Sequence, residues 1–291
     1  MPATLAVLPS PAPIAVTDAE ASDERIIGMW LHERSAHTVR AYRRAIDAFR
    51  AFVGGKPLRT VTLGDLQAFA DTLTGAASSR GQSIAAVKSL LSFAAKLGAV
   101  PFNVGAALRK PKGRDGLADR ILDEADVARM LALTAGRDHA LVRVAYAGGF
   151  RVSELVGLRW SDVVDARDGG AFLTVLGKGG KTRTVRVSSA TAKVLRELRA
   201  DAPATAYVFA GRKGGLDASQ AWRIVRAAAQ RAGIEKPVSP HFMRHAHASH
   251  ALDRGAKVTT VRDTLGHSSI AVTDRYAHAR PEESSGLALP V

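Results

Sequence analysis

The chain has 291 residues, enough for about two domains, and its 41 Lys and Arg against 27 Asp and Glu give a formal net charge of +14. This excess favours a polyanionic partner, with nucleic acid first and an acidic membrane surface second. The absence of cysteine excludes a disulfide framework and thiolate metal sites, and it is consistent with a reducing compartment.

The N-terminal segment, residues 1–22, is expected to be a disordered tail. The first 24 residues contain no Lys or Arg and are interrupted by Pro2, Pro9, Pro11 and Pro13. They therefore lack the basic start and the continuous apolar region of a signal peptide. No apolar run reaches the roughly 18 residues that span a bilayer. These features predict a cytoplasmic protein without a membrane partner.

Residues 23–108 are predicted to form a helical domain with a basic surface. Between Arg25 and Asp115 there are 15 Lys and Arg against 5 Asp and Glu. Apolar residues three and four apart predict one helix around Ile46, a second at about 62–73 and a third after Gly81. Basic residues on the far side of the first helix are expected to contact DNA phosphates, namely Arg40, Arg43 and Arg44. The alternative is that these basic faces are merely solvated.

Residues 109–116 are predicted to be a basic linker. Pro111 and Gly113 interrupt any helix there. Four basic residues fall within six positions, which suits an extended segment that lies along a DNA duplex. All four are expected to contact DNA: Arg109, Lys110, Lys112 and Arg114. A solvated hinge is the alternative.

The second domain is predicted to span 117–280 and to begin with helices. After a glycine break at Gly148-Gly149, Arg151 stands at the start of a helix, where its guanidinium and nearby backbone N–H groups are available to one anion. Glu154 follows one helical turn later and could orient this arginine. A plain surface pair of Arg and Glu is the alternative.

A β-hairpin is predicted next, with strands at 172–176 and 181–187. Lys178 lies in the glycine-rich turn at its tip. The run Gly180-Lys181-Thr182 resembles the end of a Walker motif, but the first glycine of that motif would fall at Val175. A strand also follows instead of a helix, so a P-loop is not predicted.

The stretch 237–278 carries the residues that suggest chemistry on a phosphodiester. His241 and Arg244 share one face of a predicted helix, and His267 and Tyr276 follow. A metal site is the alternative, because further histidines stand at 245, 247 and 250. However, the zinc-protease pattern requires Glu where this chain has Phe242, and no acidic ligand is at a useful spacing. We therefore predict no metal, and we expect those three further histidines to be structural.

Five motifs resemble, in order and spacing, those of the tyrosine recombinase (phage integrase) family: GGFRVSELVGL, LGKGGKTRTV, HFMRHAHASH, LGHSS and DRYAH. The resemblance covers essentially the whole chain after the tail. It implies a mainly α fold with a small β-hairpin or sheet. A helical, SAM-like core-binding domain and an α+β catalytic domain would together clamp DNA. Small departures occur, such as Ala246-His247 where the family usually has Thr-Phe.

The resemblance also implies roles in binding phosphate. Arg151 and Arg244 match the arginines that bind the scissile phosphate. His267 fills the position that hydrogen-bonds it, and Glu154 matches the acidic position that supports the site.

For proton and group transfer, Tyr276 matches the nucleophile of the family. Lys178 matches the hairpin lysine that protonates the leaving 5′ oxygen, with Lys181 as the rival if the hairpin register differs. His241 fills the position of a general acid or base.

The activity implied is site-specific DNA recombination through a 3′-phosphotyrosyl intermediate, with no cofactor, metal or ATP. The partners implied are double-stranded DNA with a specific recombination site and either identical subunits, as a tetramer on two duplexes, or a related recombinase. Residues 281–291 could dock on a neighbouring subunit, and the location would be the cytoplasm, with the nucleoid. The alternatives are a type IB topoisomerase, a non-catalytic DNA-binding or architectural protein, and a histidine-bound metalloenzyme.

Overall fold

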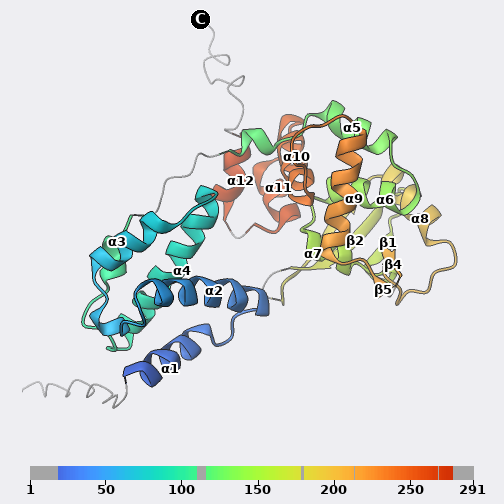
Figure 1. The fold of residues 1–291 in the computed structure, drawn as a ribbon. Helices are drawn as coiled ribbons and strands as arrows, with labels where there is room; N and C mark the ends of the chain where they lie inside the picture. The colour runs from blue at the N-terminus through green and yellow to red at the C-terminus, as the bar shows by residue number, and fades with distance from the viewer. Residues whose placement is uncertain (1–18, 110–115, 178–179, 213, 268, 278–291) are drawn as a thin grey trace, which may run out of the picture. The chain divides into compact units, whose positions relative to one another are not determined.

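The computed structural model describes residues 19–109, 116–177, 180–212, 214–267 and 269–277. The chain divides into two compact units, 1–114 and 115–291, whose elements are labelled in Figure 1. The boundary falls within the segment for which a linker is predicted. Three of the four basic residues predicted there lie outside the described residues, namely Lys110, Lys112 and Arg114.

The first unit is helical, as predicted. Its helices are α1 (Ala19–Leu31), α2 (Ala36–Phe52), α3 (Leu63–Thr72) and α4 (Ala77–Lys96), with 3₁₀ turns at Leu58–Thr60 and Val104–Ala107. Ile46, around which the first helix was predicted, is fully buried in α2, and so is Phe49. The helix α3 begins with a capping box, in which Thr62 and Asp65 each satisfy a backbone N–H group of the other.

Two helices begin earlier than predicted. The helix α1 starts at Ala19, so the last four residues of the expected tail 1–22 are helical. Their sequence, Ala-Glu-Ala-Ser, has adequate helix propensity, and the helix is anchored one residue later by buried Asp23, whose carboxylate accepts the Leu58 N–H at 2.9 Å. The helix α4 starts at Ala77, so it includes the Gly81 that was expected to precede it.

The second unit combines helices with small antiparallel sheets. Its elements are a 3₁₀ turn at Ala118–Arg120, α5 (Glu124–Ala132), α6 (Gly136–Gly148), α7 (Val152–Gly157), a 3₁₀ turn at Trp160–Asp162, β1 (Val163–Asp165), β2 (Ala171–Leu176), β3 (Thr182–Val187), α8 (Ser189–Arg199), β4 (Ala210–Gly211), β5 (Gly214–Gly215), α9 (Ala218–Arg231), α10 (Pro240–Asp253), α11 (Val258–Leu265) and α12 (Ile270–Ala277). Within the described residues, no helix has both the length and the apolar character that a bilayer crossing requires.

The predicted hairpin is formed by β2 and β3, and β1 adds a third strand in the order β1-β2-β3. Leu173 pairs with Val185, and Val175 pairs with Arg183. The strand β1 was not predicted, because three residues are too few for an alternating pattern to be recognised. On the inner face, β2 contributes Ala171, Leu173 and Val175, and β3 contributes Val185 and Val187 next to Arg183.

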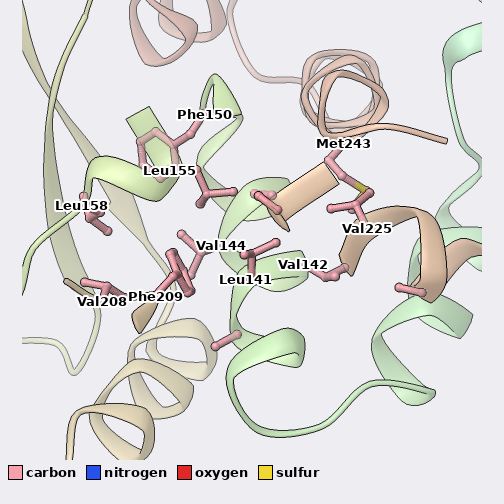
Figure 2. Packing of buried hydrophobic residues seen from close by; sticks show 14 of the residues in the cluster. Leu141, Val142, Val144, Phe150, Leu155, Leu158, Val208, Phe209, Val225 and Met243 are labelled. Carbon is pink, nitrogen blue, oxygen red and sulfur yellow. The ribbon is translucent and has the colours of Figure 1, made fainter. Parts of the chain in front are cut away.

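The core of the second unit is built around α6. Figure 2 shows Leu141, Val142 and Val144 of α6 within this cluster, and Met243 of α10 beside Val225 of α9. The apolar spacing of α5 predicts that Leu133 is buried with Val127 and Met130, but Leu133 is 50% exposed. It follows the last residue of α5 and so lies beyond the buried helical face.

The helix α6 is followed by its C-cap residue, Gly149, which has a left-handed backbone conformation with φ of 57°. A Cβ atom at this position would lie 2.5 Å from Leu265 Cδ2 and 2.9 Å from His247 Cδ2. Glycine therefore permits both the turn and the close approach of two other helices. The turn delivers Arg151 to the start of α7, so this glycine also positions the candidate site.

We expect Gly149→Ala to lower the free energy of unfolding by more than the roughly 1–2 kcal/mol of a left-handed alanine, because the added methyl group also meets Leu265 and His247. Urea denaturation of the full chain measures this effect. Gly157→Ala is the matched control, since a Cβ atom there meets nothing within 4 Å. Equal free energies of unfolding for the two variants would contradict the conclusion that the left-handed turn and the close contacts require glycine at position 149.

Candidate active site

Five of the predicted site residues lie around one pocket of about 290 Å³ in the second unit. They come from distant parts of the chain, because Arg151 precedes α7, His241 and Arg244 lie on α10, His267 follows α11 and Tyr276 lies on α12. Among the described residues, the pocket is lined by Leu117, Arg120, Arg151, His241, Arg244, His245, His267, Val272, Arg275 and Tyr276. A sixth predicted residue, Lys178, lies outside the described residues.

Arg244 is the most deeply placed cation of the pocket, with 3% of its surface exposed. Its Nη1 donates to Gly149 O and its Nη2 donates to Leu265 O, both at 2.7 Å. Burial and the nearby charge of Arg151 lower the pKa of Arg244 to about 10, so the group stays protonated at neutral pH. The two carbonyl groups fix the plane of the guanidinium, which suits directional binding of an anion.

Arg151 and Glu154 form the predicted pair one helical turn apart. The Arg151 N–H donates to Glu154 Oε2 at 2.8 Å, and Arg151 Nη1 donates to Glu154 Oε1 at 2.9 Å. Arg151 Nη2 also donates to Gly266 O at 3.2 Å. The carboxylate thus caps α7 and orients the arginine. Because Glu154 is buried, this is not the surface pair of the alternative interpretation.

Arg183 is a member of this network that the sequence analysis missed. Its Nη1 and Nη2 donate to both oxygens of Glu154 at 2.9 and 2.7 Å, and its Nε donates to Thr264 O at 2.7 Å. Burial raises the pKa of Glu154, but the hydrogen bonds from Arg183 and Arg151 outweigh burial and lower this pKa to about 2. The sequence pattern that could have identified Arg183 is its alternation with Val185 and Val187, which puts this arginine on the inner face of β3.

His267 follows Gly266, whose left-handed conformation ends α11. Its Nδ1 is hydrogen-bonded to Thr273 Oγ1 at 2.8 Å, and Thr273 is fully buried. Burial and the charge of Arg244 lower the pKa of His267 to about 4, so the ring is neutral at pH 7. With Nδ1 engaged, Nε2 is the ring nitrogen left for a ligand in the pocket.

Tyr276 is 7% exposed, and its hydroxyl is hydrogen-bonded to His245 Nδ1 at 2.7 Å. Burial raises the pKa of Tyr276, while Arg244 and Arg275 partly offset this effect. The ring of His267 stacks on Tyr276 with 6.4 Å between the ring centroids. The tyrosine therefore has a defined hydrogen-bond partner inside the pocket.

Of the three further histidines expected to be structural, His245 lies in the pocket against Tyr276. The other two contact Tyr146 instead. The Nδ1–H of His247 donates to Tyr146 O at 2.8 Å, and His250 Nδ1 is hydrogen-bonded to the Tyr146 hydroxyl at 2.9 Å. The signal for His245 was its spacing of four residues from His241, which puts both on one helical face.

His241 lies at the exposed edge of the pocket, with its ring 5.2 Å from that of His245 in an edge-to-face arrangement. Partial desolvation and the charges of Arg244 and Arg151 lower the pKa of His241. Among the residues that the structure describes, no three His, Cys, Asp or Glu side chains gather as a metal site requires.

In the first unit, the basic residues predicted to contact DNA differ in their surroundings. Arg40 and Arg44 are exposed on α2, and Arg109 is exposed after the last 3₁₀ turn. Arg43 instead forms salt bridges with Glu24 at 2.9 Å and with Asp47 at 3.0 Å. Part of its charge is therefore already compensated within the unit.

Comparison with known families matches both units. Residues 120–283 match the family described as phage integrase, and residues 29–98 match the phage integrase N-terminal SAM-like domain. The chain belongs to the phage integrase family. It is a tyrosine-type site-specific recombinase, an enzyme that cleaves and rejoins DNA, as its sequence motifs predicted.

Curated relatives share much of the sequence. The tyrosine recombinase XerC of Xylella fastidiosa (strain M23) is 37% identical over 258 residues, which cover 84% of this chain and 86% of that protein. The tyrosine recombinase XerD of Corynebacterium glutamicum is 31% identical over 273 residues, covering 84% of this chain and 88% of that protein.

Two solved structures share the fold. XerH recombinase bound to its palindromic difH substrate, in a post-cleavage complex, has a TM-score of 0.73 at 17% identity, covering 92% of this chain and 84% of that chain. A lambda integrase tetramer bound to a Holliday junction has a TM-score of 0.69 at 19% identity, covering 86% of this chain and 77% of that chain.

The depressed pKa of Glu154 predicts a pH-dependent contribution to stability. Because its pKa falls from 4.5 to about 2 on folding, the carboxylate stabilises the protein above about pH 4.5, and this contribution is lost as the pH falls towards 2. We expect Glu154→Gln to be less stable than the wild type at pH 7, with the difference shrinking below about pH 5.

Urea midpoints measured from about pH 7 to pH 3 follow this difference. Asp168→Asn is the control, because the Asp168 carboxylate pairs with Arg186 at an exposed site. Exposed ion pairs of this kind contribute little to the free energy of unfolding. A difference between wild type and Glu154→Gln that does not change with pH would argue against an ionised, hydrogen-bonded Glu154.

Proposed function

We propose that the Tyr276 hydroxyl attacks a phosphodiester within a specific recombination site, forming a 3′-phosphotyrosyl bond and releasing a 5′ hydroxyl. A 5′ hydroxyl of the partner strand then attacks this bond and rejoins the DNA. The observation that carries the proposal is one pocket that holds the Tyr276 hydroxyl together with Arg151 and Arg244.

Attack on phosphorus builds negative charge on the two non-bridging oxygens. Arg151 and Arg244 would stabilise this charge by directional hydrogen bonds, and neutral His267 would add an N–H donor from Nε2. The charge of Arg244 and the orientation of both arginines exist before DNA binds. The site is thus preorganised for the charge that develops during the reaction.

The leaving 5′ alkoxide is a strong base and needs a proton, which we assign to Lys178. The flanking residues support this assignment. A Cβ atom added at Gly177 would lie 3.7 Å from Glu154 Oε1, so the predicted turn begins beside the site network. Lys181, the rival, is exposed, and its carbonyl accepts the Gly177 N–H at 2.7 Å. His241 at the pocket edge is the second candidate for proton transfer.

Exchange of a phosphodiester for a phosphotyrosyl ester roughly conserves bond energy, so the proposed reaction requires neither ATP nor metal. Recombination joins two duplexes, and we propose a tetramer of identical subunits or of this chain with a related recombinase. The lambda integrase tetramer on a Holliday junction supports this by its fold. Residues 281–291, which lie outside the described residues, would dock on the next subunit. The enzyme would act in the cytoplasm, on nucleoid DNA.

We expect Tyr276→Phe to form no covalent adduct with a nicked suicide duplex, while its affinity for the same DNA stays within about twofold of the wild type. Gel separation of protein–DNA adducts under denaturing conditions measures the first quantity, and a mobility shift measures the second. Sequencing the trapped ends identifies the site. Covalent adducts from the Phe variant would refute the nucleophile, and relaxation of plasmid without recombinant product would favour a topoisomerase.

The exposed arginines of α2 should contribute to DNA affinity through released counterions. We expect the double variant Arg40→Ala, Arg44→Ala to reduce the slope of log K against log salt by about 2, because each phosphate contact contributes roughly 0.9. Arg43→Ala should change the slope less, because Glu24 and Asp47 already pair with Arg43. Mobility shifts at several salt concentrations test both. An unchanged slope in the double variant would remove α2 from the DNA interface.

A further inference from the structure

The contact between Tyr276 and His245 joins the proposed nucleophile to a base. His245 Nδ1 lies 2.7 Å from the Tyr276 hydroxyl, and the two rings are 5.6 Å apart and tilted by 39°. His245 extends from the middle of α10, directly after buried Arg244. This helix packs against α6 and against α12, which carries Tyr276. The base is therefore fixed in position by the same helix that fixes the phosphate-binding arginine.

The other histidines of the pocket are less suited to receive the Tyr276 proton. His267 Nδ1 is engaged by Thr273, and its ring lies parallel to Tyr276, with an interplanar angle of 9°. His241 presents its ring to His245, 5.2 Å away and at 77°. Among the described residues, the hydrogen bond recorded for the Tyr276 hydroxyl is the one to His245.

The charges around His245 keep its imidazole neutral before DNA binds. Burial has the largest effect, and it is followed by electrostatic interactions with groups on three elements, namely His241, Arg120, Arg244 and Arg275. Together they lower the pKa of His245 to about 4, so Nδ1 can accept a hydrogen bond at neutral pH. A phosphate in the pocket would offset the arginine charges and so make His245 more basic when the proton must move.

We propose that His245 is the general base that takes the proton of Tyr276 during DNA cleavage and returns it during rejoining. In cleavage, the Tyr276 O–H bond breaks, its proton moves to His245 Nδ1, and the oxygen forms a bond to phosphorus. The bond from phosphorus to the 5′ oxygen breaks, and that oxygen takes a proton from the general acid. Rejoining reverses each step. The proposal rests on the proposed function and assigns to His245 a role that the sequence analysis placed at His241.

The experiment measures single-turnover cleavage of a nicked suicide duplex by the full chain. His245→Ala removes the base, and His245→Gln keeps a hydrogen-bond acceptor that cannot hold a proton. We expect both variants to cleave about 10²-fold or more slowly than the wild type, with DNA affinity unchanged. Added imidazole should accelerate His245→Ala and leave His241→Ala unchanged.

A second substrate separates the base from the acid. With sulfur in place of the scissile 5′ oxygen, the leaving group needs no proton. Lys178→Ala should then recover most of its activity, whereas His245→Ala and His245→Gln should stay slow, because the tyrosine must still lose its proton.

Three outcomes would overturn the proposal: a His245→Gln protein within about twofold of the wild type, restoration of His245→Ala by the sulfur substrate, or imidazole rescue of His241→Ala in place of His245→Ala. The Tyr276→Phe protein distinguishes failure of the His245 proposal from failure of the proposed function. If that protein forms adducts, Tyr276 is not the nucleophile, whatever the His245 variants do.

Discussion

The active site depends on holding three guanidinium groups close together although their like charges repel. Arg151, Arg183 and Arg244 are retained by one buried carboxylate, that of Glu154, and by backbone carbonyl oxygens. The carbonyls that accept from these arginines belong to Gly149, Thr264, Leu265 and Gly266. All lie at the ends of α6 and α11, where the last carbonyl groups of a helix lack partners within the helix. The negative ends of two helix dipoles thus point at the cations.

This arrangement connects the fold to the chemistry. The left-handed glycines at 149 and 266 end the two helices, and each is followed within two residues by a site residue, Arg151 or His267. The helix α10 then contributes Arg244 between the two helix ends. The small sheet supplies Arg183, which ties β3 to Glu154 and to the end of α11.

The sequence predicted most helices, the hairpin and five of the pocket residues, because local spacing carries that information. It did not predict that Arg183 pairs with Glu154, 29 residues away, or that His245 contacts Tyr276, 31 residues away. Such contacts depend on how elements pack, which periodicity does not specify. Local signals for both existed, an arginine on the apolar face of a strand and two histidines four apart on a helix. A local pattern of this kind identifies a candidate site residue, but it does not identify the distant residue that the candidate contacts.

The salt-bridged cluster also has a consequence for charge matching. Arg151, Arg183 and Arg244 contribute three formal positive charges and Glu154 removes one, so the cluster has a net charge of two. A DNA phosphodiester carries one negative charge, whereas the pentacoordinate transition state of its displacement carries two. The net charge of this four-residue cluster therefore matches the transition state more closely than it matches uncleaved DNA. Glu154 thus sets the size of an electrostatic preference, the kind of difference in binding that accelerates a reaction.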